Sequence, residues 1–176
     1  MNNLPEHLPQ LALPPLPASR LALAEGPDGR PVATILDPQR SKAVVLTPEE
    51  WVRQHFVAWL INEKAYPRSL VVNELGLRVN GRPRRADTVV FTPDLRPLMV
   101  VEYKRASVAI TQKVFDQIVR YNMTFQAPYV AVSNGLRHFC CRIDFATHSY
   151  AFLREFPSYP ELHPCAESPE LSEQSD

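Results

Sequence analysis

The chain has 176 residues, enough for one domain with a substantial core but short for two. Hydrophobic residues make up 45% and charged residues 22%, the balance of an ordinary globular protein rather than a disordered one. No apolar run approaches the roughly 18 residues that a membrane span needs. The N-terminus also lacks the basic start and continuous apolar stretch of a signal peptide. We therefore expect a cytoplasmic protein with no membrane partner.

The formal net charge of zero is unevenly distributed along the chain. Residues 161–176 hold five acidic residues and no lysine or arginine, which leaves residues 1–160 with 19 basic and 14 acidic residues, a net charge of +5. A basic body with an acidic tail favours a polyanionic partner. This support is weak, because many proteins with the same charge balance bind nothing charged.

The three cysteines are interpreted as buried, reduced thiols. Cys140 and Cys141 are adjacent, so on a strand they point to opposite faces, and Cys165 lies near the C-terminus. There is no CxxC spacing, so neither a zinc site nor a disulfide framework is expected.

Proline is dense at both ends of the chain, where it opposes regular helix and strand pairing. We predict a Pro-rich N-terminal arm over 1–18, a single domain over 19–157 and an acidic Pro-rich tail over 158–176, with both ends extended or disordered. The LPPLP motif in the N-terminal arm has the extended character that aromatic grooves bind. A plain disordered arm is the favoured interpretation.

Periodicity and turn residues predict the elements between these ends. The clearest start signal is Thr47-Pro48-Glu49-Glu50, which has the pattern of a helix capping box. The expected fold class is α/β (α+β), with a mixed central β-sheet flanked by helices. In chain order the expected elements are a hairpin over 31–46, a helix over 47–62, strands over 70–79, 86–91 and 97–104, a helix over 110–125, a hairpin over 128–143 and a strand over 149–156.

The hairpin formed by 86–91 and 97–104 carries the most informative polar residues. A turn centred between Asp94 and Leu95 sets Asp87 directly opposite Glu102, and Lys104 shares the face of Glu102. Opposed like charges destabilise a sheet unless a cation offsets them. Two converging carboxylates suit Mg²⁺, with Mn²⁺ as a substitute, and a nearby lysine suits phosphodiester hydrolysis.

Solvated surface charge is the competing interpretation for these three residues. Glu102, however, directly follows the apolar run 98–101, which is typical of a strand buried on both faces. An unmatched charge is costly in such a place, so the catalytic interpretation is favoured.

Further polar residues surround this hairpin in the sequence. Along the second helix Lys113, Gln117 and Tyr121 recur every four residues and form one stripe, which is either an exposed polar face or a phosphate-binding surface. Glu74 is a candidate additional metal ligand. Four arginines cluster at the turn before Asp87: Arg78, Arg82, Arg84 and Arg85. Their guanidinium groups either contact phosphates or only make the turn soluble.

The order Asp87, Glu102-Tyr103-Lys104, then Gln117-x-x-x-Tyr121 resembles the Asp…Glu-x-Lys and QxxxY motifs of the PD-(D/E)xK nuclease superfamily and its RecB-like members. From about Leu46 to Phe156 the chain resembles the N-terminal nuclease domain of type I restriction enzyme R subunits, especially the short proteins that carry this domain alone. The resemblance implies a restriction-endonuclease-like core. It also implies that Asp87 and Glu102 ligate the metal, with Glu74 as the early acidic residue.

The resemblance further implies that Lys104 assists the attacking water, and that Gln117 and Tyr121 stabilise the site and contact DNA. Arg82, Arg84, Arg85, Arg105 and Lys113 are the expected DNA contacts. Restriction-modification subunits or a second copy of the chain are the expected protein partners. Because the chain has no GxxxxGK[ST] loop, no nucleotide cofactor is expected. The alternative is a catalytically silent nucleic-acid-binding or scaffold module with the same fold.

Overall fold

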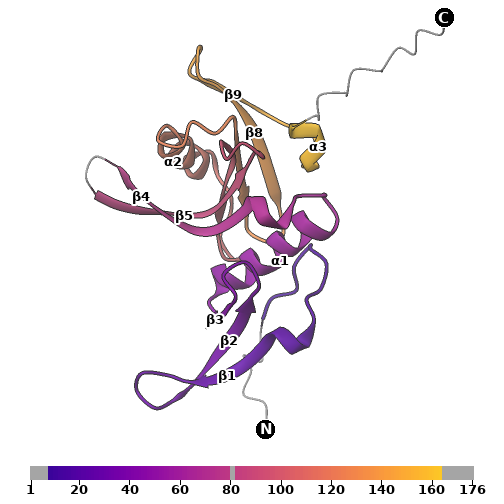
Figure 1. Cartoon of the computed structure of the whole chain (residues 1–176), viewed down its shortest axis with the longest axis vertical. Helices are drawn as coiled ribbons and strands as arrows, with labels where there is room; N and C mark the ends of the chain where they lie inside the picture. Colours follow the sequence, from indigo (N-terminus) through magenta and orange to yellow (C-terminus); the bar gives the residue numbers. More distant parts are fainter. Residues whose placement is uncertain (1–7, 80–81, 164–176) are drawn as a thin grey trace, which may run out of the picture.

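The computed structural model describes residues 8–79 and 82–163, with the side chains of 77–83 outside the description. Within these residues a three-stranded antiparallel sheet, ordered β1-β2-β3, lies beside a six-stranded mixed sheet, ordered β4-β5-β6-β7-β8-β9. Figure 1 shows α1 lying between the two sheets. The elements are η1 (Ala18–Arg20), β1 (Leu21–Glu25), β2 (Pro31–Asp37), β3 (Lys42–Val45), α1 (Pro48–Asn62), η2 (Arg68–Leu70), β4 (Val71–Val79), β5 (Arg82–Phe91), β6 (Pro97–Tyr103), α2 (Gln112–Asn122), β7 (Tyr129–Ser133), β8 (His138–Asp144), β9 (Ser149–Phe152) and α3 (Tyr159–Leu162).

The predicted fold class is confirmed, since a mixed central sheet is flanked by helices. In the large sheet every neighbouring pair is antiparallel except β6 and β7, which are parallel. The parallel pair requires a crossover, and α2 lies in that connection. The strand β1 was not expected, because its Leu-Ala-Leu-Ala sequence combines weak β-formers with little polar alternation. It gains its conformation by pairing with β2.

The two helices cover opposite faces of the large sheet. Side chains of α1, including Phe56, pack with Met99, Val101 and Tyr103 of β6. Side chains of α2, including Phe115, pack against β7 and β8. Because neighbouring strand residues face opposite sides, β6 is buried on both faces along most of its length.

The adjacent cysteines follow the same alternation. Cys140 packs in the cluster beneath α1 and Cys141 in the cluster beneath α2, so the prediction that they face opposite sides is confirmed. Both are free and buried. Burial raises the pKa of both thiols, that of Cys141 to about 11, which keeps them protonated and inert near neutral pH.

The helix α1 begins as predicted, but only half of the expected capping box forms. The Thr47 side chain accepts a hydrogen bond from the Glu50 N–H at 3.0 Å. The Glu50 carboxylate does not reach back to Thr47; it binds the guanidinium groups of Arg40 and Arg53, each at 2.8 Å. Ion pairs with two arginines offer Glu50 more than the single hydrogen bond from the Thr47 N–H that a capping box would provide.

The described parts of both chain ends pack against the core. The Ala12 N–H donates to the Gly135 carbonyl at 2.7 Å, and the Trp51 indole N–H donates to the Pro9 carbonyl at 3.0 Å. At the other end, Tyr159 of α3 is 8% exposed and belongs to the core cluster of α1. Proline thus does not prevent apolar burial at these ends, where Leu11, Leu13 and Leu162 also pack against the core cluster. Over the described ranges, no helix has the length and apolar character needed to cross a membrane.

Candidate functional site

The register of the β5–β6 hairpin follows the prediction. Thr88 pairs with Val101 and Val89 with Val100. The pairing ends there, one residue short of Asp87 and Glu102, and beyond it the Tyr103 N–H donates to the Asp87 carboxylate. The irregularity between Val90 and Phe91 lies at the turn end of the hairpin, where it does not change the register at the acids. The two acids therefore lie at the same level on neighbouring strands of the large sheet.

The carboxylate of Asp87 is held by one donor on each oxygen. Its Oδ1 accepts a hydrogen bond from Nη2 of Arg53 at 3.0 Å, and its Oδ2 accepts one from the backbone N–H of Tyr103 at 3.0 Å. Tyr103 lies on β6 directly after Glu102. The Asp87 side chain thus bridges its own strand to β6 and to α1, and it is about one quarter exposed (27%).

Glu102 and Lys104 form an ion pair on β6, with Nζ 2.7 Å from Oε1. Both side chains are a little over one quarter exposed, 29% and 27% respectively. Burial raises the pKa of Glu102, and the negative charge of Asp87 raises it further, while Lys104 acts in the opposite direction without cancelling the shift. Ionised Glu102 is therefore less stable here than it would be in water.

Glu74 lies on β4 at the same level as these acids but is engaged with arginines. Its φ is +58°, an uncommon conformation for a residue other than glycine, and it falls between the pairs Asn73–Thr88 and Leu75–Ala86. Its carboxylate lies 2.7 Å from Nη1 of Arg53 and 2.7 Å from Nη1 of Arg85. The strained backbone turns Glu74 towards these two guanidinium groups.

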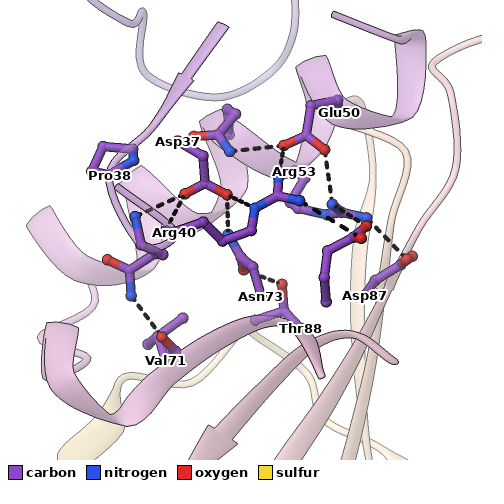
Figure 2. Close-up of polar contacts among 12 residues, drawn as sticks. Asp37, Pro38, Arg40, Glu50, Arg53, Val71, Asn73, Asp87 and Thr88 are labelled. Carbon is purple, nitrogen blue, oxygen red and sulfur yellow. Dashed lines mark hydrogen bonds and ion pairs between the residues drawn. The ribbon is translucent and has the colours of Figure 1, made fainter. Parts of the chain in front are cut away.

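A buried polar network links Glu74 and Asp87 to the small sheet, and it was not predicted from the sequence (Figure 2). Arg53 contacts Glu50, Glu74 and Asp87, and Arg40 contacts Asp37, Glu50 and, at 3.7 Å, Glu74. The sequence feature that could have predicted this network is the spacing of Glu50, Arg53 and Gln54, which puts them on one face of α1. All three are buried, on a helix whose apolar residues alone were expected to face the core.

The stripe predicted on α2 is divided between solvent and site. Lys113 and Gln117 are exposed, whereas Tyr121 is half-buried and packs beside Phe125. Within the described residues, the Tyr121 hydroxyl is buried with no hydrogen-bond partner. Burial raises the pKa of Tyr121, and the charges of Glu102 and Asp87 raise it further. Tyr121 also packs against the cluster that contains Ala86, Val89 and Val100, which lie on the two strands that carry these acids.

The predicted basic residues are only partly within the described structure. The side chains of Arg78 and Arg82 lie outside the described residues. Arg84 and Arg85 are exposed on β5, and Figure 1 shows β4 and β5 extending together past the body of the large sheet. Arg105 is exposed just after β6. The described arginines thus lie on the strands, or next to the strands, that carry the acids.

The donor set fits a small oxygen-preferring cation with few protein ligands. In the described part of the chain, no group of three or more His, Cys, Asp or Glu residues is arranged to hold a metal. Mg²⁺, however, is usually bound through one or two carboxylates and several waters. Asp87 and Glu102 are the residues that could hold such an ion, since each carboxylate has more lone pairs than its present donors use.

Comparison with known proteins identifies the family. Residues 48–157 match the family described as type I restriction enzyme R protein N terminus (HSDR_N). This segment covers more than half of the chain and contains α1, the β5–β6 hairpin and α2. The chain therefore belongs to this restriction-enzyme family.

Among solved structures, the chain is similar to a fragment assigned to an HsdR subunit of a type I restriction enzyme from Vibrio vulnificus YJ016. The two share 21% sequence identity at a TM-score of 0.49, over 66% of this chain. The chain spans 24% of the length of that fragment. No curated protein matches the chain.

Proposed function

We propose that this chain is a Mg²⁺-dependent DNA nuclease that hydrolyses phosphodiester bonds. The observation that carries the proposal is the β5–β6 register, which leaves Asp87 and Glu102 adjacent to its last pair, Thr88 and Val101. Nζ of Lys104 lies 2.7 Å from Oε1 of Glu102. Membership of a restriction-enzyme family supports the same chemistry. Asp87 and Glu102 would hold the metal, for which Mn²⁺ can substitute.

The bound metal would polarise a phosphoryl oxygen and lower the pKa of a coordinated water. Lys104, whose ammonium group lies 2.7 Å from Glu102, would hold the attacking water or offset the negative charge that develops on the phosphate. Tyr121, whose hydroxyl lacks a partner among the described residues, would donate to a phosphate oxygen, with Gln117 beside it on α2. The acids and Lys104 are thus assigned to chemistry, and α2 to substrate binding.

DNA would approach along the exposed arginines of β5 and the segment after β6. Arg84, Arg85 and Arg105 offer guanidinium groups that contact phosphates without reading sequence. Lys113, exposed on α2, would extend this surface. We also propose that the chain acts together with restriction-modification subunits, because the family is defined by the R protein of such enzymes.

The test is cleavage of plasmid and linear DNA in Mg²⁺ or Mn²⁺. Lys104→Met and Glu102→Gln are expected to reduce the cleavage rate at least about 100-fold, the usual contribution of a group that assists proton transfer. Lys42→Met and Glu63→Gln are matched controls at exposed positions and should cleave like the wild type. Cleavage that survives both site substitutions would reject the assignment.

One observation favours a second candidate, a nucleic-acid-binding module that does not cut. Asp87 is paired with Arg53 and Glu102 with Lys104, so each acid already has a cationic partner from the protein. A non-cleaving module would bind DNA with strong salt dependence and no turnover. Calorimetry with Mn²⁺ distinguishes the two, because only the nuclease site should bind the ion and lose it in Glu102→Gln.

A further inference from the structure

Arg53 is placed so that one guanidinium group binds three carboxylates. Its side chain is only 6% exposed, and Nη1 lies 2.8 Å from Oε2 of Glu50 and 2.7 Å from Oε1 of Glu74. Nη2 lies 3.0 Å from Oδ1 of Asp87. The planar fork of arginine allows its nitrogens to bind several acids at once, which a lysine ammonium on its flexible stem cannot reproduce.

A second arginine, from the turn between β2 and β3, supports this arrangement. Nη2 of Arg40 lies 2.8 Å from Oε1 of Glu50, and Nη1 lies 3.7 Å from Oε2 of Glu74. Arg40 therefore contacts the two carboxylates that also hold Nη1 of Arg53. Arg40 is itself paired with Asp37, whose carboxylate is completely buried. Both residues precede the family-matching segment, which begins at residue 48.

We propose that Arg53 is a positioning residue for Asp87, and that Arg40 holds the carboxylates that fix Arg53. The small sheet is then a structural part of the candidate site and not a separate appendage. The link to metal binding rests on the proposed function, whereas the link between Arg53 and the position of Asp87 does not. Partners that orient a metal ligand typically contribute about 10- to 100-fold to metal affinity.

The Tyr103 backbone N–H reports the position of Asp87 without any metal or substrate. It donates to Oδ2 of Asp87 at 3.0 Å, on the side of β6 that faces β5. If Arg53 fixes Asp87, removing the guanidinium group should release this hydrogen bond and speed hydrogen exchange at the Tyr103 amide. Nuclear magnetic resonance on the full-length, metal-free protein measures that rate directly.

The variants are Arg53→Gln and Arg53→Lys, with Asp87→Ala to define the exchange rate when the acceptor is absent. Arg30→Gln is the matched control, because the Arg30 side chain is 85% exposed in the turn between β1 and β2. Both Arg53 variants should exchange the Tyr103 amide nearly as fast as Asp87→Ala, and Arg30→Gln should match the wild type. If Arg53→Lys does not restore the slow exchange of the Tyr103 amide, the forked guanidinium group, and not the positive charge alone, is required.

If Arg53→Gln folds and its Tyr103 amide exchanges at the same rate as in the wild type, the proposal is overturned. If that variant does not fold, Glu50→Gln keeps Arg53 but removes one of its anchors, and it should raise the exchange rate by a smaller factor. Calorimetry with Mn²⁺ forms the second arm, with about 10- to 100-fold weaker binding expected in Arg53→Gln. A wild type that neither binds Mn²⁺ nor cuts DNA would reject the proposed function, while the Tyr103 amide would still decide the role of Arg53.

Discussion

The completely buried carboxylate of Asp37 allows a direct test of the polar network. It accepts hydrogen bonds from the Gln39 N–H at 2.8 Å, from the Asn73 amide at 3.1 Å and from the guanidinium group of Arg40. Asp37→Asn keeps the shape of the side chain, but it removes the charge and replaces one acceptor with a donor. That donor would face other donors in a space without solvent.

The expected loss of stability is large for a change of one functional group. Removing one partner of a buried ion pair costs about 3–5 kcal/mol. For a domain of this size, about 1 kcal/mol corresponds to roughly 2–4 °C in Tm, so Asp37→Asn should lower Tm by roughly 6–20 °C. Asp28→Asn is the matched control, because Asp28 is 63% exposed and lies 3.7 Å from Arg30, and its effect should stay within about 0.5 kcal/mol.

The same variant should change how stability depends on pH. Burial by itself raises the pKa of Asp37, but hydrogen bonds from Asn73 and Arg40 outweigh it, so the pKa in the folded protein lies below its ordinary value. A lowered pKa contributes stability that is present above the unfolded value of about 3.9 and is lost as the pH falls through the folded value. Wild-type Tm should therefore fall below about pH 4, and Asp37→Asn should show a flatter profile there.

Thermal melting followed by circular dichroism between neutral and acidic pH measures both effects. Equal Tm values for Asp37→Asn and Asp28→Asn at neutral pH would refute the assigned strength of the network. Parallel Tm profiles of wild type and Asp37→Asn in acid would refute the role of the Asp37 charge.

Three further predictions concern the core and the site. Phe56→Ala should cost about 3–5 kcal/mol in chemical denaturation, because Phe56 is fully buried against Tyr103 and Phe156; a cost below about 1 kcal/mol would contradict its place in the core. Tyr121→Phe should leave Tm unchanged or slightly higher, since the hydroxyl has no partner among the described residues. The same variant should cleave DNA more slowly. A clear fall in Tm would show that the hydroxyl has a structural role. The affinity for Mn²⁺, measured by calorimetry, should rise as the pH increases through the pKa of Glu102, because a carboxylate binds the ion only when it is deprotonated. That pKa is raised above its ordinary value of about 4.3. An affinity that does not change with pH would contradict metal binding through this carboxylate.

Local patterns in the sequence predicted most of the elements. The helix α1 was predicted from Thr47, Pro48 and apolar residues at helical spacing, and β5 and β6 from their valine-rich runs. A turn centred between Asp94 and Leu95 predicted the register that pairs Thr88 with Val101, next to Asp87 and Glu102. Turn length and side-chain alternation are local properties, so they can be obtained without knowing the rest of the fold. The strand β1 was missed because its Leu-Ala sequence carries no comparable local signal.

The sequence by itself thus determined most of the elements in their order, the burial of β6 on both faces and the β5–β6 register next to Asp87 and Glu102. Only the tertiary structure decided the polar partners of Asp87 and Glu74. Arg53 lies 34 residues before Asp87 in the chain, and Arg40 comes from a different sheet. Which carboxylate an arginine binds depends on the packing of α1 between the two sheets, because a charged side chain is stable in the interior only where distant segments bring it a partner.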